Sequence, residues 1–192
     1  MIAPHSLCLF GGTFDPIHDG HIHIAQLAHA KLKLDNVTFL PCQQSPHKLE
    51  SKSASAKHRF AMCQLAIKNL TWAEVHDHDL TAPTPSYSWK TAVFFKQAYP
   101  DAKLFWLMGT DQWNALHRWS RVDYLAEMVE FIVCTRGDQT LIERSYTYHT
   151  IRTDHPASST AIRKSLMKGT KPSWLSHEVQ DYLQKTKLYL SP

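Results

Sequence analysis

The chain is poor in cysteine and contains no long apolar run. Its four cysteines, at positions 8, 42, 63 and 134, form no CxxC pair, and two of them lie in apolar runs typical of strands, so we expect reduced thiols in the core of a cytoplasmic protein. No apolar stretch approaches the ~20 residues of a membrane span, and the N-terminus has no charged segment followed by an apolar one. We therefore expect no membrane partner.

Basic residues are present but never concentrated. The 21 Lys and Arg give a net charge of +4, yet no five of them are consecutive, and small anionic ligands explain such a charge as well as nucleic acid does. We expect no nucleic-acid partner; affinity for a duplex or single strand that falls steeply with salt would show the opposite. The length of 192 residues fits one domain, 1–192, whose helical C-terminal part covers 158–190.

Short apolar runs alternate with segments of helical periodicity along the chain. Helical faces are expected around residues 22–32, 60–67 and 93–98, and Pro100 ends the third. Such alternation predicts an α/β fold, a Rossmann-like doubly wound parallel sheet with helices on both faces and a C-terminal helical segment broken at 168–172. The expected strands are Leu7–Phe10, Val37–Pro41, Ala73–His76, Leu104–Met108 and Phe131–Cys134.

The segment GGTFDPIHDGH, residues 11–21, follows the first expected strand and leads into the first expected helix. A helix N-terminus at the carboxyl end of a parallel strand offers unpaired N–H groups to an anion. Gly11 and Gly12 can adopt backbone angles closed to other residues, and they carry no side chain that would keep a phosphate away. His18 and His21 would add ring N–H donors, although two histidines can also simply cap a helix. Asp15 is equally consistent with a turn cap and a chemical role.

Residues 76–79, His-Asp-His-Asp, contain side chains that could bind a metal cation. Two histidines at i and i+2 on a strand point to one face, but no distant partner can be identified. A solvated strand end is therefore favoured over a metal site.

The 11–21 segment resembles the signature of the nucleotidyltransferase superfamily, which carries a (T/H)xGH element. Later segments, in the same order and at similar spacing, narrow the resemblance to the bacterial nicotinate-nucleotide adenylyltransferases. Three positions depart from the usual pattern: Ser45, Ser88 and Ala157; none removes a proposed catalytic group. The matching segments are Ser45–Lys48, Pro85–Ser88, Gly109–Asp111 followed by Trp119, Val133–Gly137 and Ala157–Arg163.

The resemblance implies a reaction in which the phosphate of nicotinate mononucleotide attacks the α-phosphorus of ATP directly, giving deamido-NAD and pyrophosphate. It implies Mg²⁺ bound mainly through the ATP phosphates, with no metal site in the protein. His18, His21 and Arg163 would be catalytic, with Arg163 stabilising departing pyrophosphate. Taken alone, the segment around Arg163 is also consistent with a Ser-capped helix and a solvated arginine. The implied ATP contacts are Gly11, Gly12, Thr13, Phe14, His18, His21, Ser158, Ser159, Thr160 and Arg163.

The same resemblance implies a second pocket for the pyridine nucleotide. Trp119 would stack on the nicotinate, Asp111 would bind ribose hydroxyls, and backbone N–H groups near Ser88 and Trp119 would meet the carboxylate. Without the other motifs, a tryptophan is typical of a core and an exposed His-Lys pair of a solvated loop. The implied contacts are His47, Lys48, Tyr87, Ser88, Gly109, Asp111 and Trp119.

Two alternatives remain open at this point. Another superfamily nucleotidyltransferase would use a different acceptor, such as nicotinamide mononucleotide or phosphopantetheine. A nucleotide sensor would keep the ATP site without turnover, because a fold and a phosphate loop do not prove catalysis. A homo-oligomer is compatible with everything in the sequence.

Overall fold

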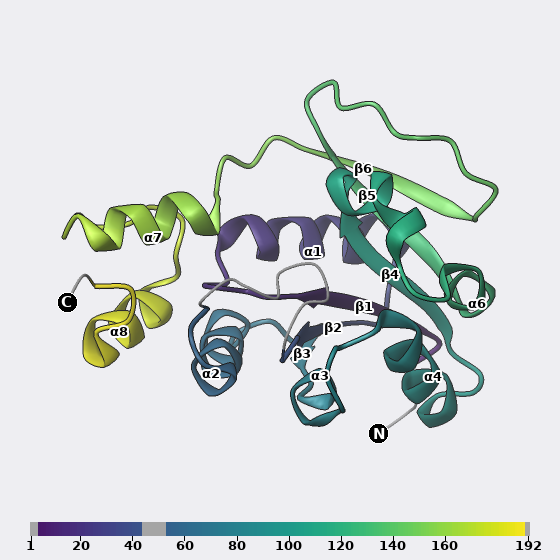
Figure 1. Cartoon of the computed structure of the whole chain (residues 1–192), viewed down its shortest axis with the longest axis horizontal. Helices are drawn as coiled ribbons and strands as arrows, with labels where there is room; N and C mark the ends of the chain where they lie inside the picture. Colours follow the sequence, from purple (N-terminus) through teal and green to yellow (C-terminus); the bar gives the residue numbers. More distant parts are fainter. Residues whose placement is uncertain (1–3, 44–52, 191–192) are drawn as a thin grey trace.

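Six parallel strands form the centre of the protein. The computed structural model describes residues 4–43 and 53–190. The sheet order is β3-β2-β1-β4-β5-β6, and every neighbouring pair is parallel (Figure 1). This is the doubly wound Rossmann-like arrangement that the sequence predicts. The strands are β1 (Ser6–Gly12), β2 (Asn36–Pro41), β3 (Ala73–Val75), β4 (Lys103–Gly109), β5 (Val129–Arg136) and β6 (Tyr148–Thr153).

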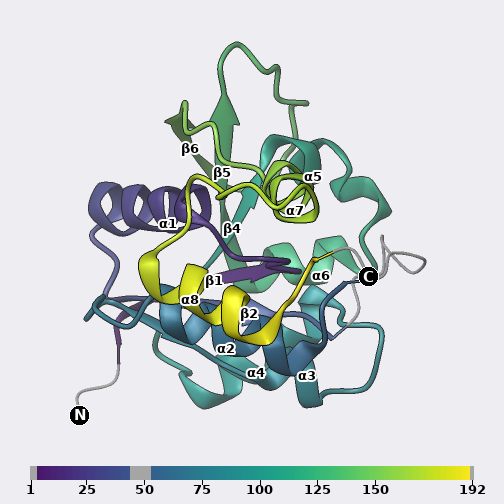
Figure 2. The same cartoon turned by 90° about the vertical axis from the view of Figure 1, so that its left-hand side faces the viewer.

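Helices fill the connections between strands. The two C-terminal helices, α7 and α8, lie together at one end of the molecule, and a view from that end shows them nearest the viewer (Figures 1 and 2). No helix within residues 4–43 and 53–190 is long and apolar enough to cross a bilayer. The helices are α1 (Asp19–Leu32), α2 (Ala56–Ala66), α3 (His78–Thr81), α4 (Ser88–Ala98), α5 (Thr110–Asn114), the 3-10 helix η1 (Leu116–Arg118), α6 (Val122–Met128), α7 (Ser159–Met167) and α8 (His177–Thr186).

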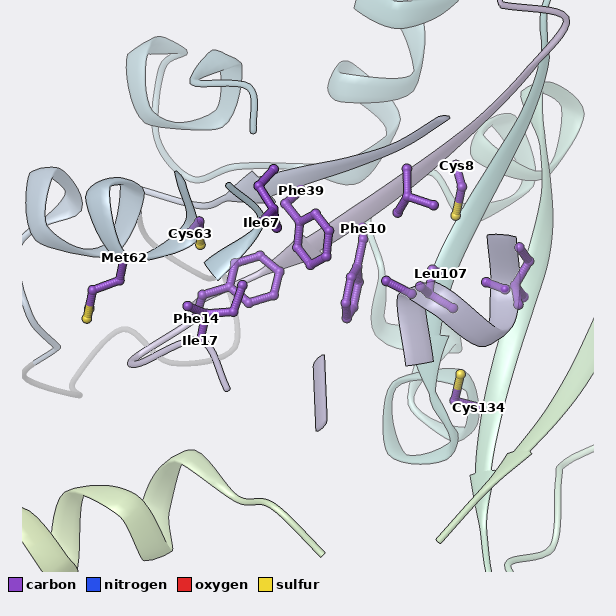
Figure 3. Close-up of a cluster of buried hydrophobic side chains, with 14 of the residues drawn as sticks. Cys8, Phe10, Phe14, Ile17, Phe39, Met62, Cys63, Ile67, Leu107 and Cys134 are labelled. Carbon is purple, nitrogen blue, oxygen red and sulfur yellow. The ribbon is translucent and has the colours of Figure 1, made fainter. Parts of the chain in front are cut away.

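Alternate side chains of β1 enter two separate cores. Cys8 and Phe10 belong to the cluster that includes residues of α1, α2 and α8 (Figure 3). Leu7 and Leu9 belong to the other cluster, which includes residues of α4, α5 and α6. Because successive side chains of a strand point to opposite faces, a strand with both faces covered must be apolar throughout.

The four cysteines lie in this buried interior, and none forms a disulfide. Burial raises the pKa of the Cys8 and Cys63 thiols well above the ordinary value. The expectation of reduced core thiols is confirmed.

The five expected strands and the three expected helices are present, as is the break between the two C-terminal helices. The sequence did not predict β6, the strand at one edge of the sheet. Its last four residues alternate between exposed and buried, so it lacks the continuous apolar run by which the other strands were predicted. It also missed the short helices α3, α5 and α6. The expectation of a solvated strand end at 76–79 was wrong: β3 ends at Val75, and Asp79 lies buried in α3, where its carboxylate accepts a 2.6 Å bond from Thr91.

A buried arginine joins the loops that follow β1 and β2. Arg59, on α2, is 1% exposed, and its guanidinium donates to three backbone carbonyls: Thr13 at 2.8 Å, Ala54 at 3.0 Å and Gln43 at 3.3 Å. A planar group with five donors suits such convergent carbonyls, whereas a lysine ammonium does not. Arg59 therefore fixes the backbone that begins the 13–18 loop.

We predict that Arg59→Leu lowers the free energy of unfolding by about 3 kcal/mol, because three carbonyl acceptors lose their donor in a buried place. Urea denaturation measures this loss. Lys57→Leu, on an exposed position of the same helix, is the matched control and should change stability by less than about 0.5 kcal/mol. Equal effects of the two substitutions would contradict the role given to Arg59.

Candidate active site

The strand order reverses between β1 and β4. From β1 the chain proceeds to β2 and β3 on one side, and from β4 it proceeds to β5 and β6 on the other. In open α/β sheets, ligands bind beyond the carboxyl ends of strands at this switch point. Gly12 and Gly109 are the last residues of the two strands.

The two glycines at the end of β1 are required for space and not for unusual backbone angles. Gly11 and Gly12 remain in the strand and neither has a positive φ, so neither uses the wider range of backbone angles open to glycine. A Cβ on Gly12 would lie 2.9 Å from the Phe14 ring, and one on Gly11 would lie 3.1 Å from the Trp106 ring. The positive φ occurs at Phe14 instead. That side chain is 3% exposed, so only its backbone remains for a nucleotide.

The α1 N-terminus brings the two motif histidines into contact. His18 is the N-cap residue, and its backbone N–H donates to Nδ1 of His21 at 3.2 Å. The rings stack with centroids 3.7 Å apart. Because Nδ1 of His21 accepts this bond, we assign the proton of its neutral ring to Nε2.

His18 is buried with one ring nitrogen unsatisfied. Its side chain is 5% exposed, and Nδ1 has no hydrogen-bond partner among the residues that the structure describes. Burial, followed by the positive charge of Arg136, lowers the pKa of His18 to about 4. Gly20 provides room for this ring, since a Cβ there would lie 3.1 Å from it. An unsatisfied buried imidazole indicates a place where a ligand completes the hydrogen bonding.

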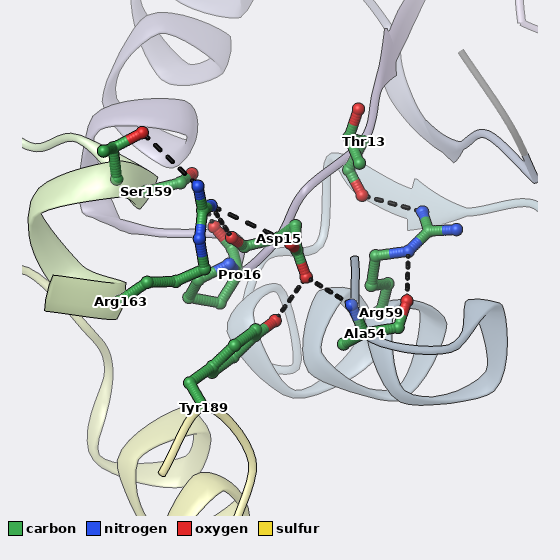
Figure 4. Close-up of polar contacts among 9 residues, drawn as sticks. Thr13, Asp15, Pro16, Ala54, Arg59, Ser159, Arg163 and Tyr189 are labelled. Atoms are coloured by element: carbon green, nitrogen blue, oxygen red, sulfur yellow. Dashed lines mark hydrogen bonds and ion pairs between the residues drawn. The ribbon is translucent and has the colours of Figure 1, made fainter. Parts of the chain in front are cut away.

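The second motif, on α7, contacts the loop that connects β1 to α1 (Figure 4). Ser158 is the N-cap residue of α7, and Ser159 donates through Oγ to the Pro16 carbonyl at 3.0 Å. Nη1 of Arg163 donates to the Asp15 carbonyl at 2.6 Å, and Nη2 donates to Oγ1 of Thr160 at 3.4 Å. Two motifs far apart in the sequence are thus in direct contact.

Asp15 links this site to the end of the chain. Its carboxylate oxygen Oδ1 accepts bonds from the Ala54 backbone at 3.0 Å and from the Tyr189 hydroxyl at 2.5 Å. The other oxygen, Oδ2, lies 3.8 Å from Nη1 of Arg163. Burial and the Asp15 carboxylate together raise the pKa of Tyr189. Asp15 is therefore a buried connector between three segments, beyond the turn cap considered from sequence.

The predicted pyridine pocket adjoins this site through two tryptophans. Trp119 follows η1 and packs edge to face against Trp106, with centroids 6.1 Å apart, and Trp106 in turn covers Gly11. Gly109 is the N-cap residue of α5, and a Cβ there would lie 2.8 Å from Oδ1 of Asp111. The carboxylate of Asp111 thus lies over the end of β4.

Tyr87 and Ser88, two more residues predicted to contact the pyridine nucleotide, lie at the start of α4 as its N-cap and first residues. The backbone carbonyl of Asp79 accepts bonds from Oγ of Ser86 and from the Gln43 backbone, both at 3.0 Å, so it joins the loops that follow β2 and precede α4. The predicted contacts His47 and Lys48 lie outside the described residues.

Comparison with known proteins agrees with this geometry. A family model described as cytidylyltransferase-like matches residues 9–165. A protein of Methylacidiphilum infernorum named "Probable nicotinate-nucleotide adenylyltransferase" is 37% identical over 96% of this chain and 92% of its own length. A protein of the same name from Staphylococcus epidermidis is 33% identical over 95% of this chain and 96% of its own length. This chain belongs to the nicotinate-nucleotide adenylyltransferase family.

The fold of the family is confirmed by a solved structure. Nicotinic acid mononucleotide adenylyltransferase of Plasmodium falciparum, complexed with NaAD, superposes with a TM-score of 0.78. The match covers 96% of this chain and 97% of that chain at 20% identity. At this identity the likeness establishes the arrangement of strands and helices.

Sequence reasoning missed three residues that shape the site: Arg59, Asp79 and Tyr189. Arg59 and Asp79 are charged residues on helices, where solvent exposure is the usual expectation. Tyr189 lies near the C-terminal end of the sequence, 174 residues from Asp15, so no local pattern connects the two. The sequence did contain one indication of such residues: Asp15 is a carboxylate between apolar neighbours and therefore needs buried partners. The sequence does not show which residues these partners are.

We predict that His18 makes stability depend on pH. Because the fold lowers the pKa of His18 from 6.5 to about 4, the unfolded chain binds a proton first, and stability is lost as pH falls through this window. The loss due to His18 is on the order of 3 kcal/mol. Urea denaturation at both ends of the window should show a larger loss for the natural chain than for His18→Asn. Parallel losses would contradict the buried neutral ring.

Proposed function

We propose that this protein transfers the adenylyl group of ATP to nicotinate mononucleotide, forming deamido-NAD and pyrophosphate. The observation that carries the proposal is the buried, unsatisfied Nδ1 of His18 at the same strand end where α7 presents Ser158 and Arg163. Helix N-termini, imidazole donors and a guanidinium together suit a polyphosphate. The names of the relatives supply the acceptor.

The residues fit direct transfer without a covalent intermediate. Phosphoryl-type transfer needs two anions placed in line and their charge neutralised on the equatorial and leaving oxygens. Burial raises the pKa of Cys42, and it raises that of Cys134 to about 12, so neither thiol is an activated nucleophile. The mononucleotide phosphate itself is the attacking group.

The proposed roles follow from position. His18 and His21 donate to the ATP phosphates from the start of α1, while Ser158, Ser159 and Thr160 line the start of α7. Arg163 neutralises charge on the departing pyrophosphate. Burial lowers the pKa of His18, and a negative phosphate bound beside the ring would raise it again. Gly11, Gly12 and Thr13 provide close backbone approach.

Magnesium is proposed as part of the ATP substrate. The described residues contain no group of three or more His, Cys, Asp or Glu side chains arranged to hold a metal ion. Mg²⁺ prefers oxygen ligands and is commonly bound through substrate phosphates. The bound ion would neutralise charge on the phosphates. The remaining charge neutralisation comes from Arg163 and the histidines.

For the pyridine nucleotide, we propose that Trp119 stacks on the ring, with Tyr87, Ser88, Gly109 and Asp111 around it. An aromatic platform suits a flat pyridine and has no counterpart in a phosphopantetheine arm. The site also fits a cytoplasmic enzyme whose partners are its two nucleotide substrates, since unbonded buried thiols suit a reducing compartment. His47 and Lys48 stay proposed contacts to the acceptor phosphate.

We predict that purified protein with ATP and Mg²⁺ releases pyrophosphate fastest with nicotinate mononucleotide. Parallel assays with nicotinamide mononucleotide and phosphopantetheine test the choice of acceptor. Faster turnover with either of them would preserve the transfer mechanism and overturn the acceptor assignment. ATP binding without turnover on any acceptor would identify a nucleotide sensor.

We predict that His21→Ala lowers kcat by about a hundredfold while the Kd for ATP changes by less than about threefold, because the imidazole acts mainly on charge that develops in the transition state. Pre-steady-state turnover and equilibrium ATP titration separate the two quantities. A comparable loss in both would show that His21 serves only ground-state binding.

A further inference from the structure

The C-terminal segment contacts the phosphate site through a single side chain. After α8 ends at Thr186, the chain turns back through left-handed conformations at Lys187 and Tyr189. The half-buried Tyr189 ring brings its hydroxyl to Oδ1 of Asp15, inside the loop between β1 and α1 (Figure 4). A segment 174 residues away in sequence thus becomes part of the phosphate loop.

Tyr189 and the backbone of Ala54 together orient the Asp15 carboxylate. Both donate to Oδ1, so the carboxylate presents Oδ2 on the side of Arg163, 3.8 Å from Nη1. The same Nη1 donates to the Asp15 carbonyl. Without one donor the carboxylate is free to rotate or to bind water, and the guanidinium loses a fixed negative neighbour.

The α8 helix provides a rigid base for this contact. Val179 and Leu183 are buried in the core cluster, and Tyr182 bonds to Nδ1 of His58 on α2 at 2.8 Å. Tyr189 therefore extends from a well-packed helix and does not depend on a loose tail. The geometry gives the C-terminal segment a way to act on Arg163 without touching the substrate.

We propose that Tyr189 is a positioning residue for the transfer reaction: through its bond to Asp15 it orients the Arg163 guanidinium for the triphosphate. The inference rests on the proposed function, in which Arg163 stabilises departing pyrophosphate. A small displacement of a charge-stabilising group lowers the reaction rate, so loss of the Tyr189 hydroxyl lowers kcat. The binding of nicotinate mononucleotide at the Trp119 end of the site is unaffected.

Tyr189→Phe tests this role by removing only the hydroxyl. We expect kcat for pyrophosphate release to fall by about tenfold and the KM for nicotinate mononucleotide to change by less than about twofold. Asp15→Asn, which retains an acceptor oxygen and removes the negative charge, should give the same split. Tyr146→Phe is the matched control, because it also deletes a tyrosine hydroxyl that donates to a carboxylate, Oδ1 of Asp123 at 2.6 Å, but on α6 and not in the C-terminal segment. It should leave kcat unchanged.

The decisive comparison repeats Tyr189→Phe in an Arg163→Ala background. If Tyr189 acts through Arg163, the hydroxyl deletion adds less than about a twofold further loss there. An equal loss in both backgrounds, or natural turnover in Tyr189→Phe, would overturn the inference. If Arg163→Ala alone leaves the rate of pyrophosphate release intact, the proposed function of Arg163 fails, and this outcome is distinct from a failure of Tyr189 alone.

Discussion

The contact between the Arg163 guanidinium and the backbone carbonyl of Asp15 is the interaction on which the site depends. At 2.6 Å it joins α7 to the loop between β1 and α1, and the bond from Ser159 to the Pro16 carbonyl joins the same two segments at 3.0 Å. The same loop is fixed from α2 by Arg59, which donates to the Thr13 carbonyl, and from the chain end by Tyr189. A loop whose proposed role is to present backbone N–H groups to an anion cannot use its own secondary structure for rigidity. It is held instead by side chains on α2 and α7 and by Tyr189, which follows α8.

The fold class and five of the six strands could be predicted from the sequence because their signals are local. Apolar runs such as Leu104–Met108 are buried on both faces, and the motif glycines and histidines lie where an α/β sheet places its ligands. The sequence did not show that Phe14 packs where a Cβ on Gly12 would lie, because this contact depends on the positive φ of Phe14. The partners of Asp15, Arg59 and Tyr189 come from distant segments, and such contacts are set by packing that no local pattern records.

The electrostatics of the proposed site are compatible with an anionic ligand. His18 is neutral when buried, with its pKa lowered to about 4, and one ring nitrogen lacks a partner among the described residues. Arg163 has its carbonyl contact to Asp15 and a carboxylate oxygen nearby, so its charge is oriented but only partly neutralised. A bound polyphosphate would accept a hydrogen bond from the His18 ring and neutralise the remaining charge of Arg163. Donors that are already in place before the reaction can stabilise the charge that develops in the transition state.

A crystal structure with Mg²⁺ and a non-hydrolysable ATP analogue tests the central claim most directly. The account predicts that the β- and γ-phosphates lie between the start of α1 and the start of α7, with His18 and Arg163 in hydrogen-bond contact with them. It predicts that the adenosine lies away from Trp119, which leaves that ring for the pyridine nucleotide. A triphosphate bound elsewhere, or an adenine stacked on Trp119, would contradict the assignment of the two halves of the site.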